Sequence, residues 1–496
     1  MISIKNKLPK HPNSRYAIMA NFFKVSTKKS NKIQEKKVLT VNIEKLDLNG
    51  CGVAYYKKKP VFVNGSLPQE NVDAKLLEQK NKYSIAKLLI INKTSPNRAV
   101  PKCQHFMVCG GCDLQHLDYS AQLSFKQSKI IELLSRAGFN TNILDTLPWQ
   151  SPILSSQWHY RHKARIGVQF DKNAQATIGF RQKSTNQLVA IKSCPVLVKP
   201  VEHIFPLLKA LINQLNVKKA VGHIEVICTD AVDIKKSAQE VTLIVRQLRT
   251  LNDHDRELWQ NYANKYQWHV LFHETVNENS SNDSDVNTNT PLNSFYIQNN
   301  LHYRLVDKIQ INFESTDFIQ INQQVNYSMV EQAMAWLAPE KNDLVLDLFC
   351  GLGNFTLPLA KKVSGVIGVE GVQSMVDKAI ANASFNNINN CQFFQADLNS
   401  EWLSNTWAKN KFTKVLLDPA RAGAEFAVKQ VIELDIETVL YVSCEPTTLA
   451  RDGQILLSHG YKIEKIGLID MFSQTKHVET MVMFRRVETT KDKTLT

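Results

Sequence analysis

Five short runs in which apolar and polar residues alternate follow one another between Val38 and Lys93. The runs are VLTVNIEKL, GVAYY, PVFVNGSL, NVDAKLLEQ and SIAKLLIINK, with Gly, Asn and Pro residues between them. A two-residue period is typical of strands with one buried face, and Gly and Pro favour the turns that join such strands. Residues 38–95 are therefore predicted to form a small β-barrel of the OB type.

A different pattern begins near Phe318, where apolar runs alternate with helix-compatible stretches. The runs are LVLDLF, VSGVIGVE, CQFFQAD, KVLLDPA and TVLYVSCE, and GLIDMFSQTKHVETMVMFRR indicates a final hairpin. Apolar strands that alternate with helices predict an α/β domain of the doubly wound, Rossmann-like type with a mostly parallel sheet. We assign this domain to residues 316–490, and residues 96–315 to a central α+β domain.

Two segments lack a hydrophobic period. Residues 1–37 contain ten Lys or Arg and one acid, which predicts a basic disordered tail in which Met19 is an alternative start of translation. Residues 277–292 form a polar tract that we interpret as a surface loop within the central domain.

Charge and cysteine content narrow the function classes. The chain has 496 residues and a net charge of +14, which favours a polyanionic partner such as nucleic acid. No apolar run reaches the roughly 18 residues of a membrane span, and no secretory signal is present, so we expect a cytoplasmic protein. Nine scattered cysteines are unlike a secreted disulfide framework and indicate metal binding or catalysis.

The stretch DLVLDLFCGLGNFTLPLA, from Asp343 to Ala360, is predicted to be a strand, a Gly-containing loop and a helix start. Thr356 stands where a third glycine of a dinucleotide fingerprint would be, so a pyrophosphate is not favoured. Glu370 ends the next strand, where an acid can accept hydrogen bonds from ribose hydroxyls. Together with an acid at the end of the first strand, this pattern suits the sulfonium ligand S-adenosylmethionine.

Cys444 is predicted at the seam between a strand and a helix that begins at Pro446. Backbone N–H groups favour negative charge at such a point, so we expect the thiol to lean toward thiolate. A thiolate that adds to carbon 6 of a pyrimidine makes carbon 5 nucleophilic enough to accept a methyl group. A base must then remove the proton at carbon 5, and Glu479 in the final hairpin is the candidate.

On these residues, the C-terminal half resembles the RNA uracil-5-methyltransferases, and GCGVAYYKKKPVFVNGSLPQE resembles their RNA-binding TRAM barrel. The likeness extends from Val38 to about Arg486, and FIQINQQVN and the cysteine cluster are similar to the branch that methylates uridine 1939 of 23S ribosomal RNA. The resemblance implies a Cys444 nucleophile and a Glu479 base. It also implies an S-adenosylmethionine site lined by Gln320, Phe349, Asn354, Glu370, Asp397 and Asp418.

The cysteine cluster CQHFMVCGGCDLQH contains Cys103, Cys109 and Cys112, with two glycines that let backbone amides turn toward sulfur. Cys194, which is followed by proline, is the candidate fourth ligand. Residue types alone fit tetrahedral zinc and a 4Fe-4S cluster equally well. The resemblance implies the 4Fe-4S cluster, for which we expect a structural or RNA-shaping role because methyl transfer needs no redox step.

Other functions remain to be weighed against this one. The family's tRNA-modifying branch usually lacks the barrel and the cysteine cluster, which disfavours a tRNA target. Cytosine-5 methyltransferases use similar chemistry but carry a cysteine near the strand that here reads LLDPAR, where many relatives have Asp-Pro-Pro-Arg. A non-catalytic RNA-binding assembly factor would not need both Cys444 and Glu479. We therefore expect a monomer that acts on a loop or single-stranded segment of 23S ribosomal RNA.

Overall fold

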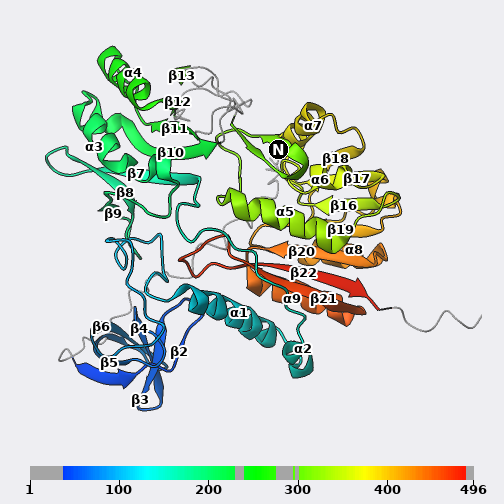
Figure 1. Cartoon of the computed structure of the whole chain (residues 1–496), viewed down its shortest axis with the longest axis horizontal. Coiled ribbons are helices and arrows are strands. Elements are labelled where there is room, and N and C mark those ends of the chain that lie inside the picture. The colour runs from blue at the N-terminus through cyan, green and yellow to red at the C-terminus, as the bar shows by residue number, and fades with distance from the viewer. Residues whose placement is uncertain (1–36, 230–238, 275–293, 296–300, 488–496) are drawn as a thin grey trace, which may run out of the picture.

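The computed structural model describes residues 37–229, 239–274, 294–295 and 301–487 of the chain (Figure 1). The predicted basic tail, apart from Lys37, and the polar tract 277–292 lie outside these ranges. Within them, none of the helices combines the length and the apolar character that a membrane crossing requires.

The first six strands form one curled sheet in the order β1-β5-β6-β4-β3-β2. β1 also packs against β3, and β4 and β6 run parallel while the other pairs are antiparallel. All five alternating runs of the sequence are strands here, and Val41, Val61 and Val72 point into the barrel core. The bounds are β1 (Val38–Asn42), β2 (Lys45–Leu46), β3 (Gly52–Tyr56), β4 (Lys59–Asn64), β5 (Asn71–Gln79) and β6 (Ser84–Lys93).

A second sheet follows in the middle of the chain, in the order β13-β12-β11-β10-β7-β8-β9. It is antiparallel except for β11 and β12, which α4 connects as parallel neighbours. Its strands are β7 (Lys163–Phe170), β8 (Ala176–Arg181), β9 (Leu188–Ala190), β10 (Val221–Thr229), β11 (Glu240–Gln247), β12 (Trp268–Glu274) and β13 (Ser294–Phe295). The helices are α3 (Ile204–Gln214) and α4 (Asp253–Tyr266), with short 3₁₀ turns at Lys199–Val201 and Lys218–Ala220.

Two helices precede this sheet in sequence but lie against the C-terminal sheet. α1 (Tyr119–Arg136) packs on α9 (Pro446–Ser458) and runs beside the hairpin of β21 (Tyr461–Ile469) and β22 (Glu479–Arg486). The short helix α2 (Thr141–Asp145) follows it (Figure 1). Ile130 and Leu134 of α1 belong to the same apolar cluster as Val482 and Phe484 of β22. The segment between the barrel and the middle sheet is therefore built into the wall of the C-terminal domain.

The C-terminal sheet has the order β18-β17-β16-β19-β20-β22-β21. The first five strands are parallel and β22 and β21 are antiparallel, so the prediction of a mostly parallel sheet is confirmed. The strands are β16 (Leu344–Leu348), β17 (Gly365–Glu370), β18 (Cys391–Gln395), β19 (Lys414–Leu417), β20 (Thr438–Ser443), β21 (Tyr461–Ile469) and β22 (Glu479–Arg486).

Helices cover both faces of this sheet, as its wholly buried central strands require (Figure 1). They are α5 (Gln323–Leu337), α6 (Thr356–Ala360), α7 (Gln373–Phe385), α8 (Glu425–Glu433) and α9 (Pro446–Ser458). A small hairpin of β14 (His302–Arg304) and β15 (Gln310–Asn312) leads into the domain, and 3₁₀ turns lie at Val306–Lys308 and Thr406–Lys409. The strand order reverses at β16 and β19, where open α/β sheets bind ligands beyond the carboxyl ends of their strands.

Candidate active site

The loop after β16 is shaped for close approach of a ligand. Phe349, Gly351 and Gly353 have φ values of 65°, 53° and 93°, so the chain turns sharply between the strand and α6. A Cβ atom added to Gly351 would meet nothing within 4 Å, which leaves open space beside the backbone. Below the loop, Asp347 is buried and accepts a hydrogen bond from Thr356 Oγ1.

Glu370 ends β17, as predicted, and its carboxylate binds backbone amides of the loops that follow β16 and β17. Its Oε2 accepts a hydrogen bond from the Gly351 amide at 3.1 Å, and its Oε1 accepts one from the Gly371 amide at 2.8 Å. Asp397 follows β18 and is exposed, and its Oδ1 accepts a hydrogen bond from the Asn399 amide at 2.9 Å. Two acids thus stand at the ends of neighbouring parallel strands, where the two hydroxyls of a ribose can be bound.

Asn354 belongs to this loop, and Gln320 lies in the segment that leads into α5. The Asn354 side chain exchanges two hydrogen bonds of 3.0 Å with Asn326 of α5, and its Oδ1 accepts a third from the Tyr303 hydroxyl at 3.1 Å. Gln320 is partly exposed and lies two residues before Asn322, which caps α5. Asn354 therefore fixes the loop to α5, at the point where the chain enters the domain.

The predicted reactive groups Cys444 and Glu479 lie at the ends of adjacent strands, next to Asp418, which was predicted to line the S-adenosylmethionine site. Asp418 follows β19 and Cys444 follows β20. Glu479 begins β22, which is antiparallel to β20 with Ser443 opposite Thr480, so the next pair in this register is Cys444 and Glu479. Glu479 is 4% exposed, and its Oε2 has no hydrogen-bond partner among the residues that the structure describes. A buried carboxyl oxygen without a partner beside a thiol is available to a substrate.

The electrostatic environment of Cys444, Glu479 and Asp418 contradicts one prediction made from the sequence. Burial, followed by the nearby Glu479 and Asp418, raises the pKa of Cys444 to about 11. The prediction that the thiol leans toward thiolate in the free protein is therefore wrong. The helix N-terminus is present, but Glu445 caps it by accepting a hydrogen bond from the Thr447 amide, and two carboxyl groups oppose a further negative charge.

The carboxyl groups respond to the same environment. Burial and then Asp418 raise the pKa of Glu479 to about 8, whereas Lys126 and Arg421 lower it. Burial raises the pKa of Asp418 and that of Asp347 to about 7. Clustered carboxyl groups with raised pKa values are typical of sites that transfer protons near neutral pH.

Sequence reasoning missed Lys126 and Asp470, which lie beside the reactive groups. Both are fully buried, and Lys126 Nζ contacts Asp470 Oδ1 at 2.5 Å. A signal was present, because Gln122, Lys126 and Ile130 follow one another at four-residue spacing and place a lysine within the buried stripe of α1. A charged residue at such a position needs a buried partner.

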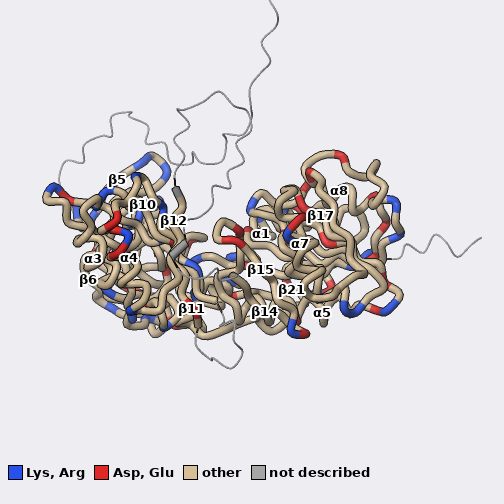
Figure 2. The backbone as a smooth tube through the Cα atoms, turned by 90° about the horizontal axis from the view of Figure 1, so that it is seen from above, with Lys and Arg blue, Asp and Glu red and all other residues tan. Residues whose placement is uncertain are grey.

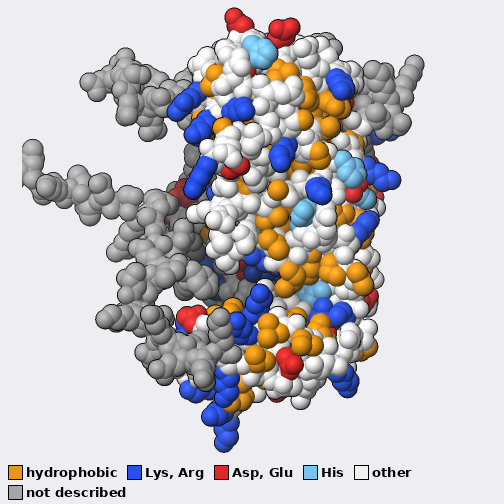
Figure 3. All heavy atoms as spheres, turned by 90° about the vertical axis from the view of Figure 1, so that its left-hand side faces the viewer, with side chains coloured by type: hydrophobic (Ala, Val, Ile, Leu, Met, Phe, Trp, Pro, Cys, Tyr) orange, Lys and Arg blue, Asp and Glu red, His pale blue; other side chains and the backbone are white. Residues whose placement is uncertain are grey.

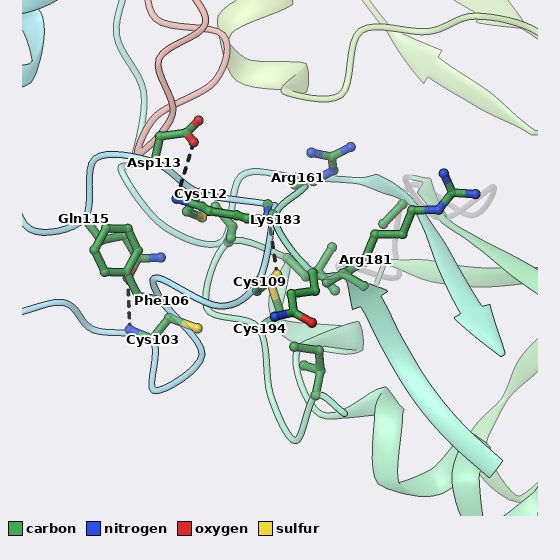
Figure 4. Close-up of a pocket in the computed structure, with 18 of the residues that line it drawn as sticks. Cys103, Phe106, Cys109, Cys112, Asp113, Gln115, Arg161, Arg181, Lys183 and Cys194 are labelled. Carbon is green, nitrogen blue, oxygen red and sulfur yellow. Dashed lines mark hydrogen bonds and ion pairs between the residues drawn. The ribbon is translucent and has the colours of Figure 1, made fainter. Parts of the chain in front are cut away.

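The four predicted ligand cysteines line one cavity of about 770 Å³ (Figure 4). Cys112 and Cys194 are 8% and 9% exposed, and Cys103 and Cys109 are half-buried. The Gly111 amide donates to Cys109 Sγ at 3.4 Å, as the glycine pattern indicated. In the described ranges, no three His, Cys, Asp or Glu side chains are arranged to hold a single metal ion.

The cysteine cavity is joined directly to the loop of residues 470–478, which precedes Glu479. The amides of Asp113 and Leu114, which follow Cys112, both donate to the Gln474 carbonyl at 3.0 Å. Lys476 and His477 of the same loop line the cavity. The cysteine cavity and the loop before Glu479, which are far apart in sequence, are therefore in direct contact.

Cationic side chains surround this region and continue onto the middle sheet. Arg161, Arg181 and Lys183 line the cysteine cavity (Figure 4). The lining of a second cavity of about 470 Å³ contains the acids Glu225 and Asp317 and a larger number of basic or His residues, namely Arg161, Lys163, Arg165, His223, Arg246 and His273. Figure 3 shows Lys and Arg side chains across the face of the barrel and middle sheet, whereas Figure 2 shows Lys and Arg positions mixed with Asp and Glu positions around the C-terminal sheet. Such a surface suits a nucleic-acid backbone.

The strand order, the glycine loop after β16 and the acids at the ends of β17 and β18 define the fold of S-adenosylmethionine-dependent methyltransferases, here with an N-terminal barrel. The chain belongs to the tRNA (Uracil-5-)-methyltransferase family, whose model matches residues 118–487. The model of the TRAM domain matches residues 32–89.

Known proteins resemble the chain over nearly its whole length. It is 56% identical over 483 residues to the 23S rRNA (uracil(1939)-C(5))-methyltransferase RlmD of Colwellia psychrerythraea, covering 94% of this chain and 99% of that protein. The protein of the same description from Psychromonas ingrahamii is 42% identical, with coverage of 94% and 100%. The crystal structure of Pyrococcus abyssi tRNA (uracil-54, C5)-methyltransferase has a TM-score of 0.68 at 24% identity, covering 90% of this chain and 99% of that one, and shows the same fold.

Proposed function

We propose that the protein methylates carbon 5 of uridine 1939 in 23S ribosomal RNA, with S-adenosylmethionine as the methyl donor. The observation that carries the proposal is that β22 pairs with β20 up to Ser443 and Thr480, which places Cys444 and Glu479 at the next positions, where Glu479 acts on the Cys444 thiol in a methyltransferase fold. The RNA target is supported by the two relatives, which share 56% and 42% of their residues with this chain and are described as acting on that uridine.

The donor site is supported by the shape of the loop after β16. When bound, S-adenosylmethionine supplies an electrophilic methyl group. Glu370 and Asp397 would hold its ribose, and Phe349, Asn354, Gln320 and Asp418 would line the rest of the site. The open space beside Gly351 and the unpartnered Oδ1 of the buried Asp347, within the described part of the chain, fit such a ligand.

Cys444 and Glu479 act at different steps of the reaction on the uracil ring. The Cys444 sulfur, once deprotonated, adds to carbon 6 of the uracil ring, and the electron pair of the 5,6 double bond becomes available at carbon 5. Carbon 5 then carries both its original proton and the new methyl group. Glu479 takes that proton, the double bond reforms and the Cys444–carbon 6 bond breaks with return of the electron pair to sulfur.

Because the pKa of Cys444 is raised, a neighbouring group must take the proton of its thiol. A thiol with a pKa of about 11 must lose its proton as the substrate binds, and ionised Asp418 can accept it, which leaves Glu479 free for the later proton removal. Arg421 favours both the thiolate and the ionised Glu479. The target uridine must leave its stack to reach Cys444, which is easiest in a loop or single strand.

The test is methyl transfer to defined RNAs. We expect the protein and S-adenosylmethionine to form 5-methyluridine at position 1939 in a 23S ribosomal RNA fragment, mapped by mass spectrometry. A fragment with cytidine at that position and a bulk tRNA sample should stay unmodified. Modification of tRNA alone, or of the cytidine fragment, would overturn the target assignment.

We further propose that Cys103, Cys109, Cys112 and Cys194 hold a 4Fe-4S cluster. The proposal is supported by the four cysteines, which all line one cavity, and by Pro195 after Cys194, since Cys-Pro occurs at iron–sulfur sites. Because the Cys112 segment donates two hydrogen bonds to the loop before Glu479, the cluster would have a structural role in the active-site wall.

The metal assignment predicts a measurable composition. Protein purified without oxygen is expected to be brown and to contain about four irons per chain. Cys112→Ser should lose most of the iron, whereas Cys391→Ser, on the far strand β18, should retain it. Stoichiometric zinc without iron in the wild-type protein would contradict the proposal. Metal analysis and visible absorption spectra make the comparison.

A further inference from the structure

Lys126 is a buried cation attached to the segment that carries Glu479. It is 0% exposed, and its ammonium group contacts Asp470 Oδ1 and donates to the Phe472 carbonyl at 3.0 Å. Asp470 is also 0% exposed, and its Oδ2 accepts hydrogen bonds from Tyr119 at 2.8 Å and Ser473 at 2.6 Å. An ion pair so fully removed from water is costly unless its groups are well satisfied, as they are here.

The geometry of the hairpin brings this pair to the catalytic base. β21 ends at Ile469, which is the cross-strand partner of Glu479, the first residue of β22. Asp470 is therefore adjacent to the residue that faces Glu479, and residues 470–478 form the loop between them. Lys126 contacts this loop at two points, so α1 fixes the place where the loop returns to the sheet.

Few charged groups face Glu479, and they come from different elements. Asp418 and Arg421 follow β19, Cys444 follows β20 and Lys126 belongs to α1. Asp418 opposes ionisation of the Glu479 carboxyl and raises its pKa, while Lys126 and Arg421 lower the pKa. Asp470 is the counter-charge of Lys126: burial lowers the pKa of the lysine, and Asp470 raises it.

We propose that Lys126 and Asp470 are a positioning pair that holds Glu479 against the target base and keeps its carboxyl group ionisable for proton removal. The inference rests on the proposed role of Glu479 as base. It adds one residue of α1, Lys126, more than 300 positions away in sequence, and one residue of the loop before Glu479, Asp470, to the machinery of adduct release. In a buried site, removing one charge of a pair acts strongly on a neighbouring acid.

The two single substitutions should act on Glu479 in the same direction, because the charge of Lys126 depends on Asp470. Lys126→Met removes the cation that lowers the pKa of Glu479, so that pKa should rise by on the order of one unit. Asp470→Asn removes the counter-charge that raises the pKa of the buried Lys126, so the lysine loses its charge more easily and the pKa of Glu479 should also rise. The double variant Lys126→Met/Asp470→Asn should shift the pKa no further than Lys126→Met does.

The measurement is infrared difference spectroscopy of the protonated Glu479 carboxyl group across pH, assigned by its absence in Glu479→Gln. This titration uses the free protein and does not depend on any RNA. A fall of the Glu479 pKa in either single variant, or no shift in either, would overturn the electrostatic role. If the wild-type protein methylates no uridine, the proposed function fails, yet the titration still decides the role of the pair.

The positioning role has its own readout. In a single-turnover assay with the 23S ribosomal RNA fragment, release of the covalent adduct should be at least about tenfold slower in the double variant at every pH, with methyl transfer little changed. The double variant leaves no unpaired buried charge and is expected to fold even where a single variant does not. Adduct release at the wild-type rate in the double variant would show that the pair does not position Glu479.

Discussion

Cys444→Ser is expected to abolish turnover while S-adenosylmethionine binding is unchanged. The side chain lies at the carboxyl end of β20, and the proposed donor site lies across β16, so removal of the sulfur leaves the donor-binding residues in place. Loss of turnover by at least about 10³-fold is expected, because a hydroxyl is far harder to ionise than a thiol and adds poorly to carbon 6.

The structure gives a further reason to expect this loss of turnover. The pKa of Cys444 is about 11 even for the thiol, so the site already works against negative charge at this position. A serine there has no route to an alkoxide near neutral pH. Transfer of a radiolabelled methyl group to the RNA fragment measures turnover, and equilibrium dialysis measures donor binding.

Cys391→Ser is the matched control for this substitution. Cys391 begins β18, and its Sγ lies near the Ile388 carbonyl rather than near β20. Wild-type turnover is expected for the control. Normal turnover by Cys444→Ser would remove the covalent step from the proposed mechanism.

The strands could be predicted from the sequence because each pattern has a local physical cause. In β1 the burial alternates with a period of two, which a strand with one buried face requires, and VLTVN shows that alternation directly. In β20 all six residues are buried, and TVLYVS is accordingly apolar apart from its ends. Such patterns identify elements without knowledge of their neighbours.

The positions of the site residues at strand ends were also predictable, because parallel strands bring their carboxyl ends to one edge. Glu370, Asp418 and Cys444 were placed in this way. Their protonation was not predictable. The Cys444 pKa depends on burial and on Glu479, whose approach is set by the antiparallel register of β22.

The Lys126–Asp470 pair could not be inferred for a similar reason. The two residues are separated by 344 positions, and the local sequence around one does not identify the other as its partner. A buried lysine on α1 indicates that a partner exists, but only packing of the helix on the hairpin identifies it. The same applies to the hydrogen bonds from Asp113 and Leu114 to Gln474, which join the cysteine segment to the base-bearing loop.

Glu479→Gln is expected to trap the protein on its RNA. The amide cannot accept the proton from carbon 5, whereas addition and methyl transfer depend on Cys444, so the reaction should stop after the methyl group has been transferred. Incubation with the RNA fragment and S-adenosylmethionine should yield a protein–RNA adduct that survives denaturing electrophoresis and carries the new methyl group. Release should be slower than in the wild-type protein by at least about 10²-fold.

Glu437→Gln provides the matched control, because Glu437 pairs with Arg485 at the opposite end of β20 from Cys444. It should turn over at the wild-type rate without accumulating adduct. If Glu479→Gln turns over freely, another group removes the proton. If its adduct forms only on the cytidine-containing fragment, the protein is a cytosine-5 rather than a uracil-5 methyltransferase.

The pH dependence of release distinguishes a base at position 479 from a residue that merely shapes the site. Burial raises the pKa of Glu479 to about 8, and the carboxyl group acts as a base only when ionised. Release by the wild-type protein should therefore be slow at pH 6 and rise through pH 8 toward a plateau. In Glu479→Gln the residual release should lose this rise, because the amide does not titrate. A wild-type profile that is flat from pH 6 to 9, measured by decay of the adduct in single turnovers, would assign proton removal to a group other than Glu479.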